Sequence, residues 1–196
     1  MISEQQRPVS SGFGAKSEPA EVMAGIDLSG KTALVTGGYS GIGTETSRAL
    51  VDAGCDVYIP ARRTDVAAKE LEGIVPAEHI VEMDLANPKS VQTFVDDFSS
   101  QVSKLDILIN NVGSIQKLAG FFDLSDEDWQ EVFDVNLMSA VRACRLFSSS
   151  LKQSVSPRII NITSIAASRP GDVFPHYSAV KAGLCNLTIS LARTLA

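Results

Sequence analysis

The sequence predicts an α/β domain built on a doubly wound parallel sheet, and three observations lead to this fold class. From Lys31 onward, short runs rich in β-branched residues alternate with longer stretches of helical periodicity. The runs TALV, LDILI and RIINI are apolar on both faces, which is typical of strands that helices cover on each side. A glycine-rich turn separates the first strand from the first helix. Strict alternation favours parallel strands joined by right-handed crossover helices.

The elements follow from this alternation in chain order. We expect strands over Thr32–Val35, Asp56–Ile59, His79–Met83, Leu105–Ile109 and Ile159–Ile162. We expect helices over Gly41–Ala53, Thr64–Leu71, Asn87 to about Gln101, Ser125 to about Leu151, and Tyr177–Ala196.

Capping signals mark several of the helix boundaries. Gly54 ends the first helix, because glycine readily takes the left-handed conformation found there. Thr64 is expected to cap the second helix and Asn87 the third, which has a proline at its first position. Ser125 and Asp128 resemble a capping box that opens a long helix.

The chain divides at about residue 26. Residues 1–26 are predicted to form a flexible arm, since their first part is rich in polar residues, glycine and proline. A short helix is possible within the arm, with Ser17 as its cap, Pro19 in its first turn and Gly25 at its end. Residues 27–196 form the predicted dinucleotide-binding and catalytic domain.

Composition excludes several classes of function. The 196 residues, of which 44% are hydrophobic, suffice for one sizeable core. The net charge of −6 argues against a nucleic-acid or anionic-membrane partner, because both require clustered basic residues. Three cysteines without metal-ligand spacing indicate buried thiols and no metal site. No segment has the length and apolarity of a membrane span, so we expect a soluble, cytoplasmic protein.

The turn TGGYSGIG has the pattern of a phosphate-binding loop. Gly37 permits a tight turn, Gly41 lets the backbone approach a pyrophosphate, and Gly43 allows close packing of helix and strand. The N-terminus of the following helix favours an anion. An ordinary glycine turn is the alternative. The predicted cofactor-contacting residues of the loop are Gly37, Tyr39, Ser40, Gly41, Ile42 and Gly43.

The end of the second strand bears on the choice between dinucleotides. An acid there would bind a ribose hydroxyl and repel a 2′-phosphate, but Ala61 stands at that position. Arg62 and Arg63 follow, and a guanidinium suits phosphate oxygens. NADP(H) is therefore favoured, while NAD(H) stays possible because both arginines could simply be solvated.

Further cofactor contacts are predicted where the third and fourth strands end. Asp84 can accept a hydrogen bond from an adenine amino group, with Leu85 beside it, although an aspartate at a helix entry is the plainer interpretation. Asn110 opens the sequence NNVG at the same edge of the sheet. Its amide could line the cofactor crevice, tie neighbouring strands together, or do both.

A candidate reacting group lies on the final helix. Tyr177 and Lys181 are four residues apart and share one helical face. An ammonium within about 4–6 Å stabilises a phenolate, which makes the pair a plausible general acid or base. Ser164 follows the last predicted strand, where its hydroxyl could bind a substrate carbonyl. Asn136 is a polar residue inside the long helix and could hold a water in line with Lys181.

These motifs, in this order and spacing, resemble the short-chain dehydrogenase/reductase family over residues 30–196. The resemblance implies a Rossmann-like fold with strand order 3-2-1-4-5 and hydride transfer between a nicotinamide and a small-molecule carbonyl or alcohol. It implies that Tyr177 is the acid or base, that Lys181 holds the nicotinamide ribose, that Ser164 orients the carbonyl and that Asn136 supports a water relay. It also implies a homo-oligomer formed through helices 126–151 and 177–196.

The sequence departs from the family pattern mainly at its carboxyl-terminal end, and two alternatives to an active enzyme stay open. Members of the family continue past the final helix into further strands and a substrate-covering loop, so the later strands are expected to be missing here. The chain could therefore be a catalytically incompetent fragment, or a nucleotide-binding and dimerisation module. His176 is expected to line the pocket or lie at the surface, and Trp129, Phe121 and Phe122 to pack the loop before the long helix.

Overall fold

The chain folds around one parallel sheet with the strand order β3-β2-β1-β4-β5, as the sequence predicted. A computed structural model describes residues 11–14, 16–84 and 87–195. The strands are β1 (Thr32–Thr36), β2 (Asp56–Ala61), β3 (Ile80–Glu82), β4 (Ile107–Asn110) and β5 (Arg158–Asn161). Each lies within two residues of its predicted position.

The strand order places a switch point at the centre of the sheet. β1 pairs in parallel with both β2 and β4, and the chain crosses from the outer strand β3 back to β4. The loops that leave β1 and β4 therefore diverge to opposite sides. Thr36 pairs with Asn110 at the carboxyl ends of these strands, and open sheets of this kind bind ligands outside such an edge.

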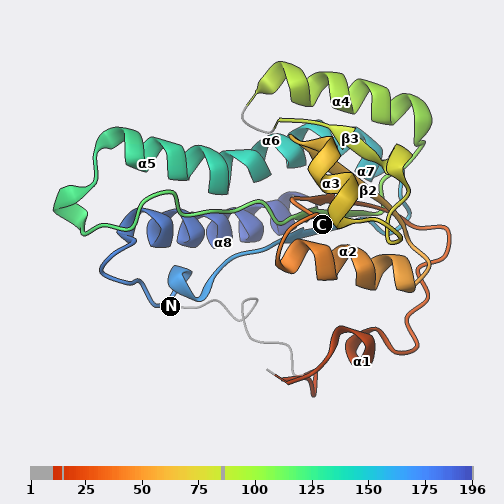
Figure 1. Cartoon of the computed structure of the whole chain (residues 1–196), viewed down its shortest axis with the longest axis horizontal. Coiled ribbons are helices and arrows are strands. Elements are labelled where there is room, and N and C mark those ends of the chain that lie inside the picture. Colours follow the sequence, from red (N-terminus) through yellow and green to blue (C-terminus); the bar gives the residue numbers. More distant parts are fainter. Residues whose placement is uncertain (1–10, 15, 85–86, 196) are drawn as a thin grey trace.

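Helices cover both faces of the sheet, and Figure 1 shows α2 and α4 on opposite sides of it. One face carries α2 (Ile42–Asp52) and α3 (Thr64–Glu70). The other face carries α4 (Pro88–Gln101), α6 (Ser139–Leu146) and α7 (Ser148–Lys152). On that side, α8 (Pro175–Leu195) packs along α5 (Asp126–Phe133).

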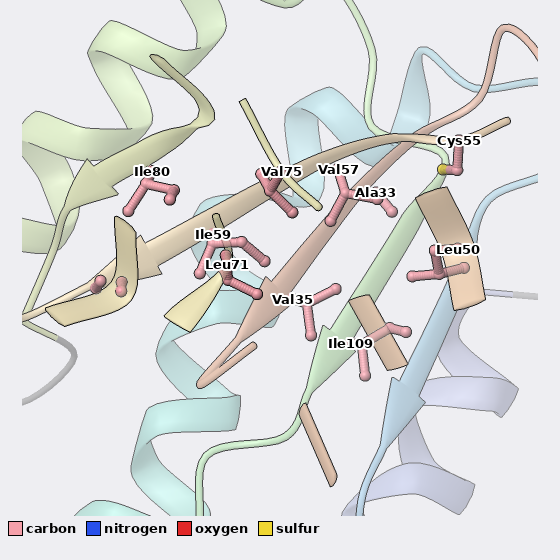
Figure 2. Packing of buried hydrophobic residues seen from close by; sticks show 12 residues of the cluster. Ala33, Val35, Leu50, Cys55, Val57, Ile59, Leu71, Val75, Ile80 and Ile109 are labelled. Carbon is pink, nitrogen blue, oxygen red and sulfur yellow. The ribbon is translucent and has the colours of Figure 1, made fainter. Parts of the chain in front are cut away.

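The hydrophobic core consists of two clusters, one on each face of the sheet. On the side of α2 and α3, Val35, Ile59 and Ile109 project from three adjacent strands (Figure 2), where Leu71 packs against them. On the other side, Phe94 and three further buried aromatic or aliphatic side chains fill the space under α4 and α6, namely Phe98, Phe147 and Leu108. Full burial of such a side chain contributes about 1.5–3 kcal/mol to folding. The buried clusters on the two faces therefore fix the sheet against its helices.

The capping predictions at Gly54, Asn87 and Ser125 are confirmed, and those at Ser17 and Thr64 are wrong. Gly54 has a φ of +85° and follows Ala53, the C-cap of α2. Asn87 accepts from the N–H groups of Lys89 and Ser90 at the start of α4. Ser125 and Asp128 form the capping box of α5. Thr64 does not cap α3, because it is already the first helical residue and Arg63 takes the cap position.

The predicted single helix from Ser125 to Leu151 is wrong in one respect. A π turn over Asp134–Met138 interrupts it and separates α5 from α6, and the stretch ends in the short helix α7. π turns occur mostly as rare single turns inside α-helices, and the residues on both sides keep ordinary helical preferences, so the sequence pattern did not locate this one.

The N-terminal segment contains the short helix α1 (Pro19–Met23), as the sequence suggested. Its cap position is Glu18, whose N–H donates to the carboxylate of Glu21, and Ser17 instead accepts from the N–H of Gly14. Residues 1–10, which belong to the predicted flexible arm, lie outside the described residues.

β5 is the last strand of the sheet, so one of its edges carries no neighbouring strand among the described residues. Ile160 on this strand is 44% exposed. A mainly apolar groove runs beside it between α6, α7 and the last turns of α8, with Ile159, Leu187 and Leu191 among its walls.

Candidate active site

A cleft of about 690 Å³ opens at the carboxyl edge of the sheet, beside the switch point. The glycine-rich turn, the ends of β2 and β3, the loop after β4, the π turn and α8 all contribute to its walls. Of the residues predicted from the sequence, those that line this cleft are Gly37, Tyr39, Ser40, Gly41, Ile42, Arg62, Asp84, Tyr177 and Lys181.

The other predicted site residues lie beside the cleft wall or outside the described chain. Gly43, Arg63, Asn110, Asn136 and Ser164 are not among the residues that line the cleft. Leu85 lies outside the described residues.

The glycine turn is built around close contacts that leave no room for side chains. Gly37 has a φ of +63°, a conformation that favours glycine. A Cβ atom on Gly43 would collide with the carbonyl oxygen of Gly37. A Cβ atom on Gly38 would lie 2.6 Å from Ile59 Cδ1 and 2.7 Å from Ser47 Oγ. The turn is therefore pressed against β2 and α2.

Hydrogen bonds fix this turn to its neighbours. The hydroxyl of Ser47 lies 2.9 Å from the carbonyl oxygens of both Gly38 and Gly43, to which it donates. The amide of Asn111 donates to the carbonyl oxygen of Gly37 at 3.1 Å. Thr36 Oγ1 accepts from the N–H of Asn111 at 3.0 Å. These bonds join the loops after β1 and β4 across the switch point.

The helix that follows β1, α2, begins at the cleft without a side-chain cap. α2 starts at Ile42, Gly41 occupies its cap position, and no side chain accepts from its first N–H groups. Ser40, Gly41 and Ile42 are exposed and line the cleft. The N–H groups of Gly43 and Thr44 donate to the carbonyl oxygens of Ser40 and Gly41. The N–H groups of Gly41 and Ile42 and the partial positive charge of the helix start are left to suit an anionic ligand.

The two arginines after β2 are placed differently. Arg62 is exposed and lines the cleft, whereas Arg63 is exposed at the start of α3 and does not. Ala61, where an acid would favour the ribose hydroxyl, is 2% exposed and closes the strand. The mouth of the cleft at β2 therefore presents a guanidinium and no carboxylate from this strand.

Asp84 and Asn110 occupy separate environments. Asp84 lines the cleft just after β3, and its N–H donates to Ser90 Oγ at 2.9 Å. Asn110 is 4% exposed, and its amide donates to Asn161 Oδ1 at 2.8 Å and to Cys144 Sγ at 3.3 Å. The Asn110 side chain thus ties β4 to β5, and its backbone neighbours Asn111 and Val112 line the cleft instead.

Asn136 lies on the π turn and is completely buried. Its Oδ1 atom accepts from the N–H of Ser114 at 3.1 Å, and its Nδ2 atom donates to the carbonyl oxygen of Ser114 at 2.8 Å. Nδ2 also donates to the carbonyl oxygen of Val132 at 3.0 Å. The side chain therefore clamps the loop that follows β4.

Lys181 reaches the same loop from α8. It is 2% exposed, and its ammonium donates to the carbonyl oxygen of Ile162 at 3.0 Å. A Cβ atom on Gly113 would lie 2.9 Å from both Lys181 Nζ and Asn136 Oδ1. Burial lowers the pKa of Lys181, and the nearby thiol of Cys185 opposes this effect.

Tyr177 stands one helical turn before Lys181, as its spacing predicted. The ammonium nitrogen of Lys181 lies 5.6 Å from the centroid of the Tyr177 ring. Both side chains line the cleft, and the tyrosine is only partly buried. The hydroxyl of Tyr177 makes no hydrogen bond to any described residue.

Ser164 caps the 3-10 turn over Ile165–Ala167, which packs against α8. Its hydroxyl oxygen accepts from the N–H of Ala166 at 3.2 Å. Since this bond uses an oxygen lone pair, the hydroxyl hydrogen stays available to donate. Thr163, the residue before it, lines the cleft.

His176 and its aromatic neighbours form a separate packed group. His176 is completely buried and is not among the residues that line the cleft, so it is neither a surface residue nor part of the cleft wall. The centroid of its ring lies 5.9 Å from that of Trp129. Neither ring nitrogen has a partner among the described residues, and burial lowers the pKa of the imidazole. Trp129 also contacts Phe121, as expected for loop packing, while Phe122 is 96% exposed.

Sequence reasoning missed the backbone contributions to this site. The side chain of Asn136 bonds to the backbone of Ser114, and Lys181 donates to the carbonyl oxygen of Ile162. Both side chains also lie close to Gly113. Main-chain groups of this kind have no sequence signature. Ser47 also went unnoticed, although its position one turn into α2 could have suggested a contact with the glycine turn.

The described residues contain no group of three or more metal-ligating side chains. None of the helices in this part of the chain combines the length and apolarity needed to cross a bilayer.

The fold and the cleft together define a class of α/β protein that binds a ligand at the switch point, and comparison with known proteins identifies the family. The family model described as short chain dehydrogenase matches residues 31–196. The chain therefore belongs to the short-chain dehydrogenase family.

Individual relatives agree with this assignment. The uncharacterized oxidoreductase YvaG of Bacillus subtilis is 33% identical over 173 residues, which cover 87% of this chain and 63% of that protein. A 3-oxoacyl-[acyl-carrier-protein] reductase of Synechocystis is 32% identical, over 86% of this chain and 70% of its own length. The chain thus spans about two thirds of the length of these relatives.

Among solved structures, the Pseudomonas aeruginosa RhlG/NADP active-site complex superposes with a TM-score of 0.78 at 28% identity. The match covers 87% of this chain and 69% of that one.

Proposed function

We propose that this chain is the nucleotide-binding and catalytic part of an oxidoreductase that transfers a hydride between NADP(H) and a small-molecule carbonyl or alcohol. The observation that carries the proposal is the cleft itself. It brings the glycine turn, Arg62 and the pair Tyr177 and Lys181 to one continuous surface.

The residues of the cleft fit a dinucleotide. Its volume of about 690 Å³ lies within the range of small-molecule and cofactor sites. The uncapped start of α2 supplies N–H groups for a pyrophosphate, and Asp84 supplies an acceptor for an adenine amino group. A Cβ atom on Gly41 would meet no atom within 4 Å, so this glycine leaves the cleft side of the turn open to such a ligand.

NADP(H) is the preferred cofactor in this proposal. Arg62 stands at the cleft where a 2′-phosphate would lie, and Ala61 offers no carboxylate to repel it. Support also comes from the RhlG complex, which contains NADP. NAD(H) is the alternative, and Arg62 is the residue that discriminates between the two.

When bound, the nicotinamide supplies or accepts the hydride. Tyr177 gives its hydroxyl proton to the substrate oxygen during reduction and takes it back during oxidation. Lys181 faces the Tyr177 ring and stabilises the negative charge that the tyrosine then carries. Ser164 donates its free hydroxyl hydrogen to the same substrate oxygen and so orients the carbonyl.

Asn136 acts through the loop that it clamps. By holding both backbone groups of Ser114, it keeps Gly113 against the Lys181 ammonium. A water held near this junction would connect Lys181 to solvent and resupply the proton that Tyr177 gives away.

The proposal includes self-association in the cytoplasm. α5 and α8, which lie largely within the two predicted interface stretches, pack side by side. A dimer through their outer faces would also shield the apolar groove beside β5. Sedimentation velocity tests this part: we expect a dimer or larger species, and a stable monomer would contradict it.

The experiment that tests the function is a pair of measurements on the same preparation. NADPH and NADH are titrated against the protein, and NADPH oxidation is followed with a panel of aldehydes and ketones. Binding of NADPH together with carbonyl turnover supports the proposal. Binding without turnover would instead favour a nucleotide-binding module or an incomplete enzyme.

A further inference from the structure

The π turn over Asp134–Met138 is the least regular element near the site, and it contains Asn136. Such turns are uncommon and form where other contacts favour the extra residue. The contacts that hold this turn therefore decide where the Asn136 side chain lies.

Ser139 closes the turn with two hydrogen bonds. Its N–H donates to the carbonyl oxygen of Asp134, which is the long bond that defines a π turn. Its hydroxyl donates to the carbonyl oxygen of Val135 at 2.6 Å. Ser139 is 5% exposed, so water does not readily replace either bond.

Asp134 is held from both sides of the turn. Arg142, which lies two turns further along on α6, donates to Asp134 Oδ1 at 3.1 Å. Gln130, one turn earlier on α5, donates to Asp134 Oδ2 at 2.8 Å. The carboxylate thus bridges the helices on either side of the irregular turn, and Arg142 is the charged partner.

We propose that Ser139 and Arg142 are positioning residues, which hold the π turn so that Asn136 clamps Ser114 and sets Gly113 against Lys181. Ser139 lines the same cleft as Tyr177 and Lys181. The bonds of its hydroxyl and N–H, and of Arg142 to Asp134, stay within the π turn and the helices beside it. The proposed route from these two residues to the site is therefore through Asn136. The consequence for turnover rests on the proposed function, whereas the consequence for the loop after β4 does not.

The first test uses hydrogen–deuterium exchange and needs no activity. Ser139→Ala removes only the hydroxyl, and Ser148→Ala is the matched control because its hydroxyl makes the same kind of bond, to Arg145 O at 2.7 Å, outside the turn. We expect Ser139→Ala to raise exchange of segment 113–116 about fivefold to tenfold, as loss of one buried hydrogen bond implies. Unchanged exchange, or an equal rise in Ser148→Ala, would overturn the proposal.

Arg142 provides a second, independent variant. Arg142→Met keeps most of the apolar stem but removes the charge, and Arg142→Lys restores a cation. We expect faster exchange of segment 113–116 in the methionine variant and its partial recovery in the lysine variant. Equal exchange in both variants would show that the ion pair does not hold the turn.

The turnover test is a double-mutant comparison with Asn136→Ala. We expect Ser139→Ala to lower kcat while leaving KM for NADPH nearly unchanged, and to have no further effect in the Asn136→Ala background. Independent, additive losses would contradict action through Asn136. If the unsubstituted chain shows no turnover, the proposed function fails, and the exchange measurements decide the positioning role by themselves.

Discussion

Asn136 and Lys181 approach Gly113 from two different helices, and a side chain on that glycine would lie 2.9 Å from a polar atom of each. Both are buried, and neither can withdraw into solvent. The loop after β4 is therefore held between an amide from the π turn and an ammonium from α8. This junction links the cofactor side of the cleft to Tyr177.

Gly113→Ala tests this junction. The added methyl group would displace Asn136 or Lys181, so we predict a loss of unfolding free energy of about 1–3 kcal/mol, as for other overpacked sites. Turnover should fall more than NADPH affinity. Gly120→Ala is the control, because a Cβ atom there meets only Asp123 Oδ2 at 3.5 Å. A Gly113→Ala protein with unchanged turnover would mean that the junction tolerates displacement.

Arg62→Ala tests the cofactor preference. Loss of charge-assisted hydrogen bonds worth about 1.5–3 kcal/mol should weaken NADPH binding by roughly tenfold to a hundredfold and leave NADH binding almost unchanged. Arg63→Ala, which changes an arginine outside the cleft, should have a smaller effect. Titration of both nucleotides against each variant checks this prediction. Equal effects of the two substitutions would assign no special role to Arg62.

Asp106 makes stability depend on pH. It is 1% exposed, and its carboxylate accepts from the N–H of Thr32 at 3.0 Å and from the hydroxyl of Ser154 at 2.5 Å. The ammonium of Lys104 lies 3.0 Å from Asp106 Oδ2. Burial raises the pKa of this carboxyl, but these partners outweigh burial and lower it from 3.8 to about 2. The stabilisation is therefore complete above about pH 4 and is lost as the pH falls toward 2.

Asp106→Asn should consequently be less stable by about 2–3 kcal/mol at pH 7, because hydrogen bonds to a charged group are lost. As the pH falls through about 2, its stability should approach that of the unsubstituted chain, in which Asp106 is then becoming protonated. Urea unfolding at the two pH values measures the difference, and Asp52→Asn, at an exposed aspartate, serves as the control. A constant difference across this range would contradict the assignment.

Lys181→Met should separate stability from function. The buried ammonium is held by one backbone carbonyl, and its pKa is lowered by burial, so its charged form is disfavoured in the fold. Replacing a buried ion with an apolar side chain of similar volume often stabilises a protein by about 1 kcal/mol or more. We predict a higher melting temperature and loss of turnover. A lower melting temperature would show that the ammonium contributes to folding as well.

Sequence patterns sufficed for the sheet because its strands are short apolar runs bounded by turn signals. They also sufficed for residues whose chemistry is local, such as Asn87 at a helix start or the spacing of Tyr177 and Lys181. The π turn escaped prediction because it is a rare single turn whose residues have ordinary helical preferences. Thr64 was misassigned by one residue, because a threonine is also accommodated at the first helical position and helix boundaries are the least certain part of a prediction from sequence.

The site was predictable at the level of side chains but not of backbone. Asn110 was expected at the cofactor crevice or between strands, and the structure has its amide between β4 and β5. The backbone groups that receive Asn136 and Lys181 belong to Ser114 and Ile162, whose side chains suggested no role. Such contacts depend on which loops the strand order brings together, and only the fold provides that information.

The central claim is most directly tested by NADPH oxidation in the presence of a carbonyl panel, measured in parallel for the unsubstituted chain and for Tyr177→Phe. The substitution removes one hydroxyl that makes no bond to any described residue, so folding and NADPH binding should be unchanged. We predict turnover of at least one carbonyl by the unsubstituted chain and a loss of about a hundredfold or more in the variant, in line with general acid catalysis. Equal rates in the two proteins, or NADPH binding without any turnover, would contradict the account.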